Sequence, residues 1–363
     1  MNDYSRFIAP ERRSVPTPSK MVENGKCVFG TFDREFESMD LLAIDNPTEA
    51  PIFLNRLKYT AWEAVEVHLA EGVLLAACCD MGIFGQILNI FYDKRKKKVF
   101  SWAAKVPSKD AVVAGNLING SESKTSGKHF SFSCINNFQE GKCSLKGWME
   151  GKDGRISYDF QLNRISKPSV VSIPFADPAV RHRPLYSQKD FFQVSGAMKF
   201  GDESFLAASD ATAIVDDHKG YYPRHAHYDW LTTMGVNETD GEKKWFAFNL
   251  TRNQSVDQEK YNENLIWLEN EISLLPPVTF ERDIPTLEFQ DHATWKIRDE
   301  HDMVNVTYKV YDIFRMVTHA KPIVNIEYFV TFGEIEGYVR DESGKKYILD
   351  GMLGLGEDKT LLL

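Results

Sequence analysis

Short runs of apolar and aromatic residues, bounded by turn residues, recur along the first half of the chain. They lie at residues 62–69, 73–79, 83–92, 99–104, 129–135, 142–150 and 156–162. Turn signals return about every 8–12 residues, a spacing typical of β-sandwiches and β-barrels. The pattern predicts antiparallel strands joined by short turns. The basic run at residues 94–98 separates two of these strands, so we interpret it as a solvated turn and not as a nucleic-acid patch.

A second series of strand-like runs occupies the C-terminal half. They lie at residues 205–215, 224–234, 244–250, 265–268, 293–297, 304–311, 323–332, 337–339 and 346–349. No segment shows the full periodicity of a long amphipathic helix, and the best candidate, residues 258–268, matches it incompletely. Without alternating strands and helices, a doubly wound sheet or a (β/α)₈ barrel is disfavoured. The sequence therefore predicts an all-β protein.

The length of 363 residues exceeds that of one ordinary domain and predicts two. An irregular, proline-bearing segment at residues 166–183 could link them. We expect an N-terminal arm at residues 1–50, a first β-domain at 51–205 and a second at 206–363. The boundary between the two domains is placed to within about 20 residues.

The net charge of the chain excludes some classes of binding partner. Lys and Arg number 43 and Asp and Glu number 52, which gives a formal net charge of −9. An acidic surface repels phosphate backbones and anionic lipid head groups, so neither nucleic acid nor membrane insertion is expected.

Several features favour a cytoplasmic location. The longest apolar run, residues 73–79, is shorter than the roughly 20 residues of a spanning helix. Charged side chains spread through the first thirty residues and leave no apolar core for a signal peptide. The five cysteines include no CxxC pair and fit reduced thiols.

The densest group of polar and aromatic side chains lies at residues 216–230. Gly220 and Pro223 mark a turn, and strand alternation should follow it. Alternation places Arg224, Ala226, Tyr228 and Trp230 on one face, and His225, His227 and Asp229 on the other. Neither face suits an ordinary apolar core, so we expect at least one of them to border water or a polar cavity.

Three interpretations of this segment are open. His-x-His-x-Asp on one strand face could bind a metal, but no second ligand pair accompanies it, and no metal or cofactor is predicted. His227 or Asp229 could instead move a proton while Arg224 holds an anionic or oxygen-rich part of a ligand. The third interpretation is a structural hydrogen-bond network at a barrel mouth.

A second polar group follows the aromatic strand at residues 244–250. It comprises Asn249, Arg252, Asn253, Asn262 and Asn264. These side chains could orient a ligand, or they could cap loops, because a buried amide needs hydrogen-bond partners.

Four separated motifs carry a resemblance to a known family. They are residues 184–189 (PLYSQK), 217–224 (DHKGYYPR) with Trp230, 248–250 (FNL), and 332–337 (FGEIEG) with 354–357 (GLGE). In this order and spacing, from about residue 55 onward, the chain resembles a bacterial family catalogued as domain of unknown function 2804. His218 stands where members typically carry Trp or Tyr.

The resemblance implies an architecture. The family is distantly similar to two-barrel lipocalin-like proteins, among them carotenoid hydratases, tocopherol cyclase and pericyclase-type enzymes. These proteins hold an apolar ligand in or between β-barrels. The implied fold is two antiparallel lipocalin-like (calycin-type) β-barrels or curved sheets packed together, with room for one apolar or amphipathic small molecule.

On this basis we expect an aromatic-lined site for a small molecule. The expected catalytic residues are Asp217, His227 and Asp229. The expected ligand-binding residues are Tyr222, Arg224, Tyr228, Trp230, Lys189, Asn249, Arg252 and Glu357. If the protein is an enzyme, the expected chemistry is proton-driven hydration, isomerisation or cyclisation. Two other functions are open: a non-catalytic carrier of a hydrophobic metabolite, and a carbohydrate-active enzyme with paired carboxylates such as Asp217 and Asp229.

Overall fold

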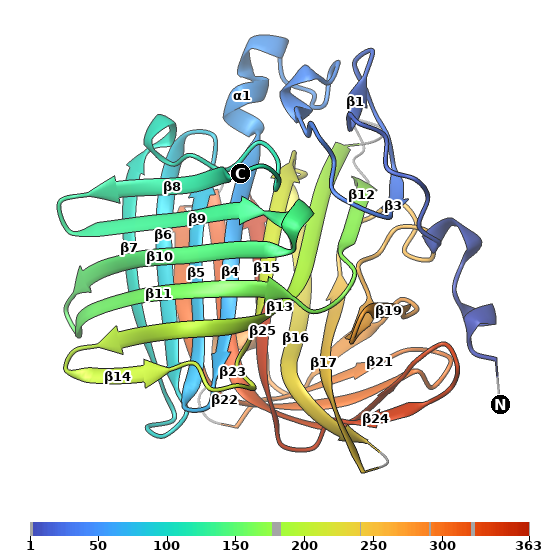
Figure 1. Cartoon of the computed structure of the whole chain (residues 1–363). Helices are drawn as coiled ribbons and strands as arrows, with labels where there is room; N and C mark the ends of the chain where they lie inside the picture. Colours follow the sequence, from blue (N-terminus) through green and yellow to red (C-terminus); the bar gives the residue numbers. More distant parts are fainter. Residues whose placement is uncertain (1–2, 176–182, 240, 290–291, 321–323, 363) are drawn as a thin grey trace. The chain divides into compact units, whose positions relative to one another are not determined.

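Strands make up nearly all the regular structure of the protein (Figure 1). The computed structural model describes residues 3–175, 183–239, 241–289, 292–320 and 324–362. Within these ranges the one α-helix is the single turn α1 (Asn55–Lys58). The 3₁₀ helices are η1 (Ser5–Phe7), η2 (Pro10–Arg12), η3 (Leu41–Ala43), η4 (Ile52–Leu54), η5 (Ser108–Asp110), η6 (Phe138–Glu140) and η7 (Thr286–Glu288). The predicted all-β class is confirmed.

Two segments test the local interpretation of the sequence. Residues 258–268, the best helix candidate, form no helix and end in a short strand. The basic residues 94–97 form the turn between two strands, as the pattern predicts. No helix in the described part of the chain is long and apolar enough to cross a membrane.

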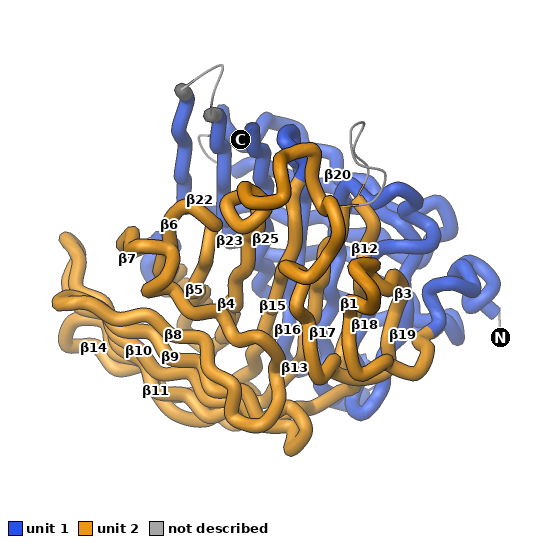
Figure 2. The backbone as a smooth tube through the Cα atoms, turned by 90° about the horizontal axis from the view of Figure 1, so that it is seen from above, with its two compact units in different colours: residues 1–13, 96–99, 223–363 blue, residues 14–95, 100–222 orange. Residues whose placement is uncertain are grey.

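The chain forms two compact units (Figure 2). Unit 1 contains Met1–Arg13, Lys96–Val99 and Pro223–Leu363, and unit 2 contains Ser14–Arg95 and Phe100–Tyr222. The chain therefore passes from unit 2 to unit 1 between Tyr222 and Pro223, inside the polar segment at residues 216–230.

Unit 2 is built on a curled antiparallel sheet of thirteen strands. These are β3 (Gly30–Phe32), β4 (Thr60–Leu69), β5 (Gly72–Asp80), β6 (Phe84–Asp93), β7 (Lys98–Pro107), β8 (Ser121–Gly127), β9 (Phe130–Asn137), β10 (Lys142–Gly151), β11 (Gly154–Arg164), β12 (Ser169–Phe175), β13 (Arg183–Phe200), β14 (Glu203–Leu206) and β15 (Thr212–Gly220). The main order is β7-β6-β5-β4-β15-β13-β11-β10-β9-β8, and β12 and β14 also pair with β13. A separate hairpin joins β1 (Val22–Glu23) to β2 (Lys26–Cys27).

Strand alternation gives the sheet of unit 2 an inner face. Val65 and Val67 of β4 and Val215 of β15 lie in its hydrophobic core. Because side chains two residues apart share a face, Glu63 and Asp217 point to the same inner face as these valines.

Unit 1 is built on a curled antiparallel sheet of ten strands. These are β16 (His225–Thr239), β17 (Glu242–Arg252), β18 (Leu265–Leu268), β19 (Glu271–Leu274), β20 (Thr279–Arg282), β21 (Thr294–Arg298), β22 (Val304–Ala320), β23 (Val324–Arg340), β24 (Lys346–Ile348) and β25 (Met352–Leu362). The order is β19-β18-β17-β16-β25-β23-β22-β21-β20, with β24 paired to β23. The last strand of the chain, β25, therefore lies between β16 and β23. The prediction of two antiparallel curved sheets is confirmed.

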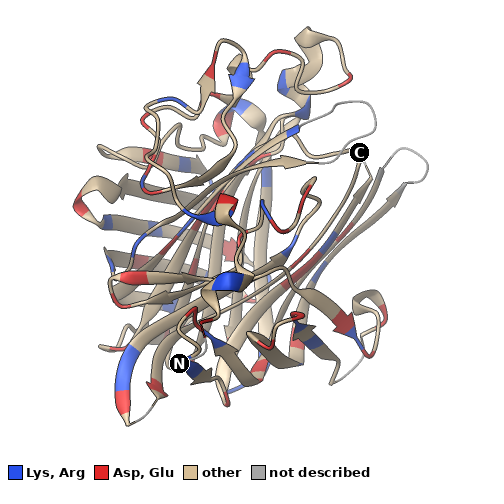
Figure 3. Cartoon of the chain, turned by 90° about the vertical axis from the view of Figure 1, so that its right-hand side faces the viewer, with Lys and Arg blue, Asp and Glu red and all other residues tan. Residues whose placement is uncertain are grey.

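The inner face of unit 1 holds its hydrophobic core, which includes Leu231, Phe248, Leu250 and Trp295. Leu250 lies across from Leu231 in the β16–β17 pair, and Arg252 lies across from Asp229. The apolar inner face thus continues into charged residues at one end. Charged positions occur on strands as well as in loops (Figure 3).

The start of the chain belongs to unit 1 through Arg12, whose side chain is buried. Its guanidinium donates to the carbonyl oxygens of Leu275 (3.3 Å) and Asn264 (3.2 Å) and to the side-chain oxygen of Asn262. These bonds compensate the cost of burying the charge.

Candidate functional site

Strand β16 carries the polar segment in the alternating arrangement that the sequence predicts. Nε2 of His227 lies 3.2 Å from Oδ1 of Asp229, so both side chains lie on one face of the strand. Tyr228 and Trp230 lie on the other face, where they form separate hydrogen bonds.

Asp229 is fully buried and is held by two arginines. Arg252 approaches Oδ2 through Nε at 2.9 Å and through an Nη at 2.8 Å, and Arg282 pairs with Oδ1. Burial opposes ionisation of this carboxyl. The hydrogen bond from His227 and the charge of Arg282 outweigh burial and hold the pKa of Asp229 below its ordinary value.

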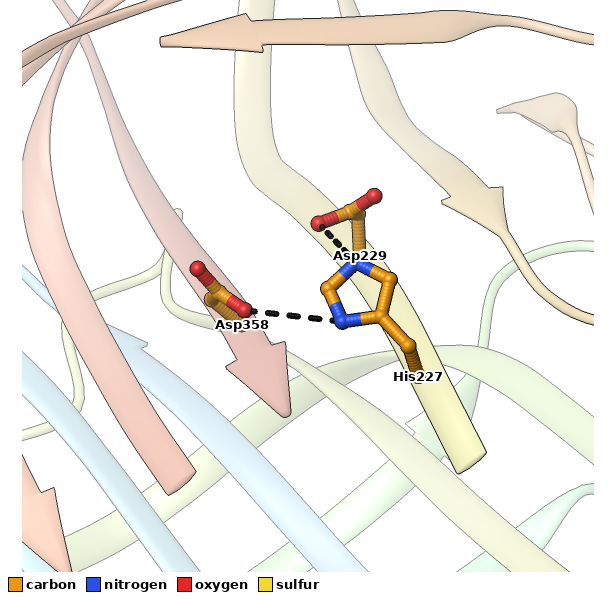
Figure 4. A group of neighbouring side chains, drawn as sticks. All are labelled: His227, Asp229 and Asp358. Atoms are coloured by element: carbon orange, nitrogen blue, oxygen red, sulfur yellow. Dashed lines mark ion pairs between the residues drawn. The ribbon is translucent and has the colours of Figure 1, made fainter. Parts of the chain in front are cut away.

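His227 is the accessible member of the group, because 37% of its side chain is exposed. Its Nδ1 lies 2.9 Å from Oγ1 of Thr360. The same nitrogen lies 3.9 Å from Oδ1 of Asp358 (Figure 4). The hydrogen bond to Asp229 raises the pKa of His227 above its ordinary value. Burial opposes this shift, and the charges of Asp229 and Asp358 add to it.

A second set of contacts fixes Asp358. Oγ1 of Thr286 donates to Oδ2 of Asp358 at 2.6 Å, and Nε of Arg282 lies 3.5 Å from the same oxygen. Arg315 donates to the backbone carbonyls of Thr286 (3.1 Å) and Phe289 (2.6 Å). The loop around η7 is thereby tied to the charged end of the sheet.

The group could be considered a metal centre, since one ligand atom each of His227, Asp229 and Asp358 lie within 4.8 Å of one another. Its surroundings argue otherwise. Arg252 and Arg282 both pair with Asp229 and offset the charge that would attract a divalent cation. The arrangement suits proton transfer better than metal ligation.

The opposite face of β16 carries a different network. Glu357 of β25 accepts hydrogen bonds from the hydroxyls of Tyr228 (2.9 Å) and Tyr328 (2.5 Å). The indole of Trp230 donates to Oδ1 of Asn249. Four of the expected ligand-binding residues therefore lie on this face, and only Arg252 joins His227.

Lys189 belongs to unit 2 and forms a buried cluster with Asp216 and His218, at the start of the polar segment 216–230. Its Nζ lies 3.2 Å from Oδ1 of Asp216, 2.8 Å from Nε2 of His218 and 3.0 Å from Oγ of Ser187. Burial opposes ionisation of Asp216. The charges of His218 and Lys189 outweigh burial and lower the pKa of Asp216 to about 2.

Tyr222 continues this cluster as part of an aromatic stack in unit 2. Its ring stacks on Trp62 at 5.7 Å between centroids, and Trp62 stacks on His218 at 4.8 Å. Arg224, by contrast, is exposed, and no described contact joins it to His227 or Asp229.

Asp217 points to the inner face of unit 2, away from the Lys189 cluster. It is fully buried and pairs with Lys219, which follows it on the same face of β15. Burial raises the pKa of Asp217 to about 7, and the charge of Lys219 opposes the shift without cancelling it.

Several members of these groups were not expected from the sequence pattern. They are Arg282, Asp358, Thr360, Lys219 and Glu63. Asp358 directly follows the expected Glu357, and Lys219 follows Asp217 at the strand spacing of two. The sequence pattern could therefore have identified both residues. Arg282 comes from a strand distant in sequence and had no local signal.

The chain matches the family model described as "Domain of unknown function (DUF2804)" over residues 12–361. The protein belongs to this family. The family resemblance that the motifs carry is therefore confirmed. No curated protein matches this chain. Among solved structures, it is similar to kievitone hydratase from Nectria haematococca at 9% identity and a TM-score of 0.46. The match covers 85% of this chain and 90% of that chain.

Proposed function

We propose that this protein binds an apolar or amphipathic small molecule and catalyses proton transfer on it, with His227 as the group that exchanges the proton. The reaction would be a hydration, an isomerisation or a cyclisation. One observation carries the proposal: His227 is partly exposed, and its Nε2 is held 3.2 Å from the buried carboxylate of Asp229.

The surroundings of His227 suit a proton donor. Asp229 orients the imidazole and stabilises its protonated form, and the hydrogen bond from His227 and the charge of Arg282 keep Asp229 itself ionised. With Nε2 directed at Asp229, Nδ1 is the nitrogen left for proton exchange, and among the described residues it meets only the neutral hydroxyl of Thr360 at hydrogen-bond distance. A raised pKa keeps a larger share of His227 protonated near neutral pH.

The neighbouring side chains favour a ligand with an apolar body and one polar end. Leu231 follows Asp229 on the same face of β16, and Phe248 and Leu250 of β17 lie in the same core. The exposed part of Arg252 adds a cationic group beside His227. A ligand lying along this face would place its polar end at the imidazole.

The test begins by identifying small molecules that co-purify with the full chain, by native mass spectrometry. Each is incubated in deuterated water with the wild type, with His227→Gln and with His225→Gln. We expect solvent deuterium in the product of the wild type and of His225→Gln, because His225 is exposed and outside the cluster. His227→Gln should convert the substrate at least about a hundredfold more slowly than the wild type.

Undiminished turnover by His227→Gln would remove His227 from the mechanism. A bound molecule that the wild type retains unchanged would point instead to a carrier.

A further inference from the structure

The inner face of unit 2 carries a cluster of buried polar groups that the proposed chemistry does not use. Glu63 of β4 and Gln188 of β13 lie directly across from Asp217 on the two strands that flank β15. All three side chains are fully buried. Two carboxyls directly opposite each other in a sheet repel when both are ionised, so this arrangement costs stability.

Most polar side-chain atoms around Asp217 have hydrogen-bond partners. Nδ2 of Asn136 donates to both oxygens of Glu63, at 3.0 Å and 3.1 Å, and Oγ of Ser123 donates to one of them. Gln188 accepts from the hydroxyl of Tyr186 at 2.7 Å.

Asp217 is different. Oδ1 pairs with Lys219, but Oδ2 is buried and has no hydrogen-bond partner among the described residues. A buried oxygen without a partner is rare in folded proteins.

The charges around Asp217 leave an acidic excess. Asp190, which shares the inner face, accepts a hydrogen bond from Gln188 and pairs with Arg164 at 2.8 Å. Arg164 also pairs with Glu35. The group therefore contains more carboxyls than cations, namely Glu35, Glu63, Asp190 and Asp217 against Arg164 and Lys219. This imbalance favours a positively charged ligand.

We propose that Asp217, Lys219, Glu63 and Gln188, the Asp217 cluster, form a second small-molecule site, which takes a ligand bearing a protonated amine. An ammonium N–H would donate to Oδ2 of Asp217, and the positive charge would offset the acidic excess. The hydroxyl of an alcohol would supply the donor but not the charge. A divalent metal would lack free ligands, because the oxygens of Glu63 are already engaged by Asn136 and Ser123.

Aromatic and apolar side chains complete the site. Nζ of Lys219 lies 5.7 Å from the ring centre of Tyr186, and Asp217 is among the charges that raise the pKa values of Tyr59 and Tyr186. Tyrosine rings favour cations over neutral groups. Val65 and Val215, on the same face, would contact the alkyl part of the ligand.

Protons should be coupled to binding at this site. The groups that act on Asp217 are Lys219 and Asp216 on its own strand and Glu63 on β4. Asp217 in turn acts on Tyr186 of β13 and on Tyr59 just before β4, and Asp190 of β13 shares the inner face. An ammonium ligand requires the ionised carboxylate. Below pH 7 binding should therefore release a proton, and affinity should rise about tenfold per pH unit until it levels off above that value.

The experiment is isothermal titration calorimetry of the full chain with n-hexylamine and with 1-hexanol, at pH values on both sides of 7. We expect the amine to bind at least about tenfold more tightly than the alcohol, with proton release below pH 7. Asp217→Asn should weaken amine binding by about tenfold or more. Asp216→Asn is the matched control, because the neighbouring side chain points to the opposite face and pairs with Lys189.

Equal binding of amine and alcohol, or amine binding that Asp217→Asn leaves intact, would overturn the proposal. If Asp217→Asn fails to fold, the comparison of amine with alcohol across pH on the wild type still decides. The site does not depend on the proposed chemistry in unit 1, so His227→Gln should bind the amine as the wild type does.

Discussion

The indole nitrogen of Trp230 donates a hydrogen bond of 2.5 Å to the side-chain oxygen of Asn249, and both residues are buried. Asn249 in turn donates to the backbone carbonyl of Glu263 at 2.8 Å. The tryptophan thus links β16 through β17 to the loop that precedes β18. Trp230, which the sequence predicted to bind a ligand, contacts a neighbouring strand. This contact gives it a structural role.

Trp230→Phe should lower the free energy of unfolding by about 1–3 kcal/mol, because it leaves the amide oxygen of Asn249 buried without its donor. Urea denaturation measures the loss. Trp245→Phe, at a partly exposed position of β17, should change stability by only about 0.5 kcal/mol. Equal losses for the two variants would show that the hydrogen bond contributes little.

Asp229→Asn should both destabilise unit 1 and lower the pKa of His227. Removing the charge leaves two arginines without their shared partner, at a cost of about 3–5 kcal/mol. The raised pKa of His227 depends first on the hydrogen bond to Asp229, so an NMR titration should find it lower in the variant. Asp358→Asn, 3.9 Å from Nδ1, should lower it less. An unchanged titration in Asp229→Asn would contradict this assignment.

Asp217 should make the protein less stable as pH rises towards neutrality. Its pKa is about 7 in the folded state and about 4 in the unfolded chain, so between these values only the folded state keeps the proton. The unfolded state then binds fewer protons, and the contribution of Asp217 to stability falls by about 1.4 kcal/mol per pH unit. Urea denaturation of the wild type and Asp217→Asn at several pH values should show curves that differ in slope across this window. Parallel curves would refute the shift.

Gly333→Ala should disrupt the pairing of β22 with β23. A Cβ at this position would lie 1.9 Å from the backbone oxygen of Lys309, and Gly333 pairs with Val310 next to a shift in register. Backbone cannot yield as a side chain tip can, so we expect a loss of about 3 kcal/mol or more, measured as a fall in Tm. Gly115→Ala serves as the control, since nothing lies within 4 Å of its added Cβ.

Local pattern was enough to predict many of the strands and the two faces of the segment around His227, but it did not predict β8, β12, β13 or β25. Alternation of side chains is a property of a single strand, so it placed His227 with Asp229 and Tyr228 with Trp230 before any partner strand was known. The family was also evident, because its motifs are short and contiguous.

The partners of these residues could not be predicted in the same way. Arg282 and Asp358 reach Asp229 and His227 because β20 and β25 arrive from distant parts of the sequence. Which strands pair, and in what register, depends on the whole sheet and leaves no local trace. For the same reason the sequence could not show that Asp217, Lys189 and Tyr222 make their contacts within unit 2, whereas His227 and Asp229 make theirs within unit 1.

The strand order of unit 1 bears on how the protein is made. Its centre is completed by β25, which is synthesised after the other nine strands of this sheet, while Arg12 belongs to the same unit and is synthesised before all of them. Unit 2 has all its strands by residue 220 and could mature while synthesis continues. Unit 1 must wait for residues 352–362, so a nascent chain stalled short of β25 should expose the edges of β16 and β23 and depend on chaperones.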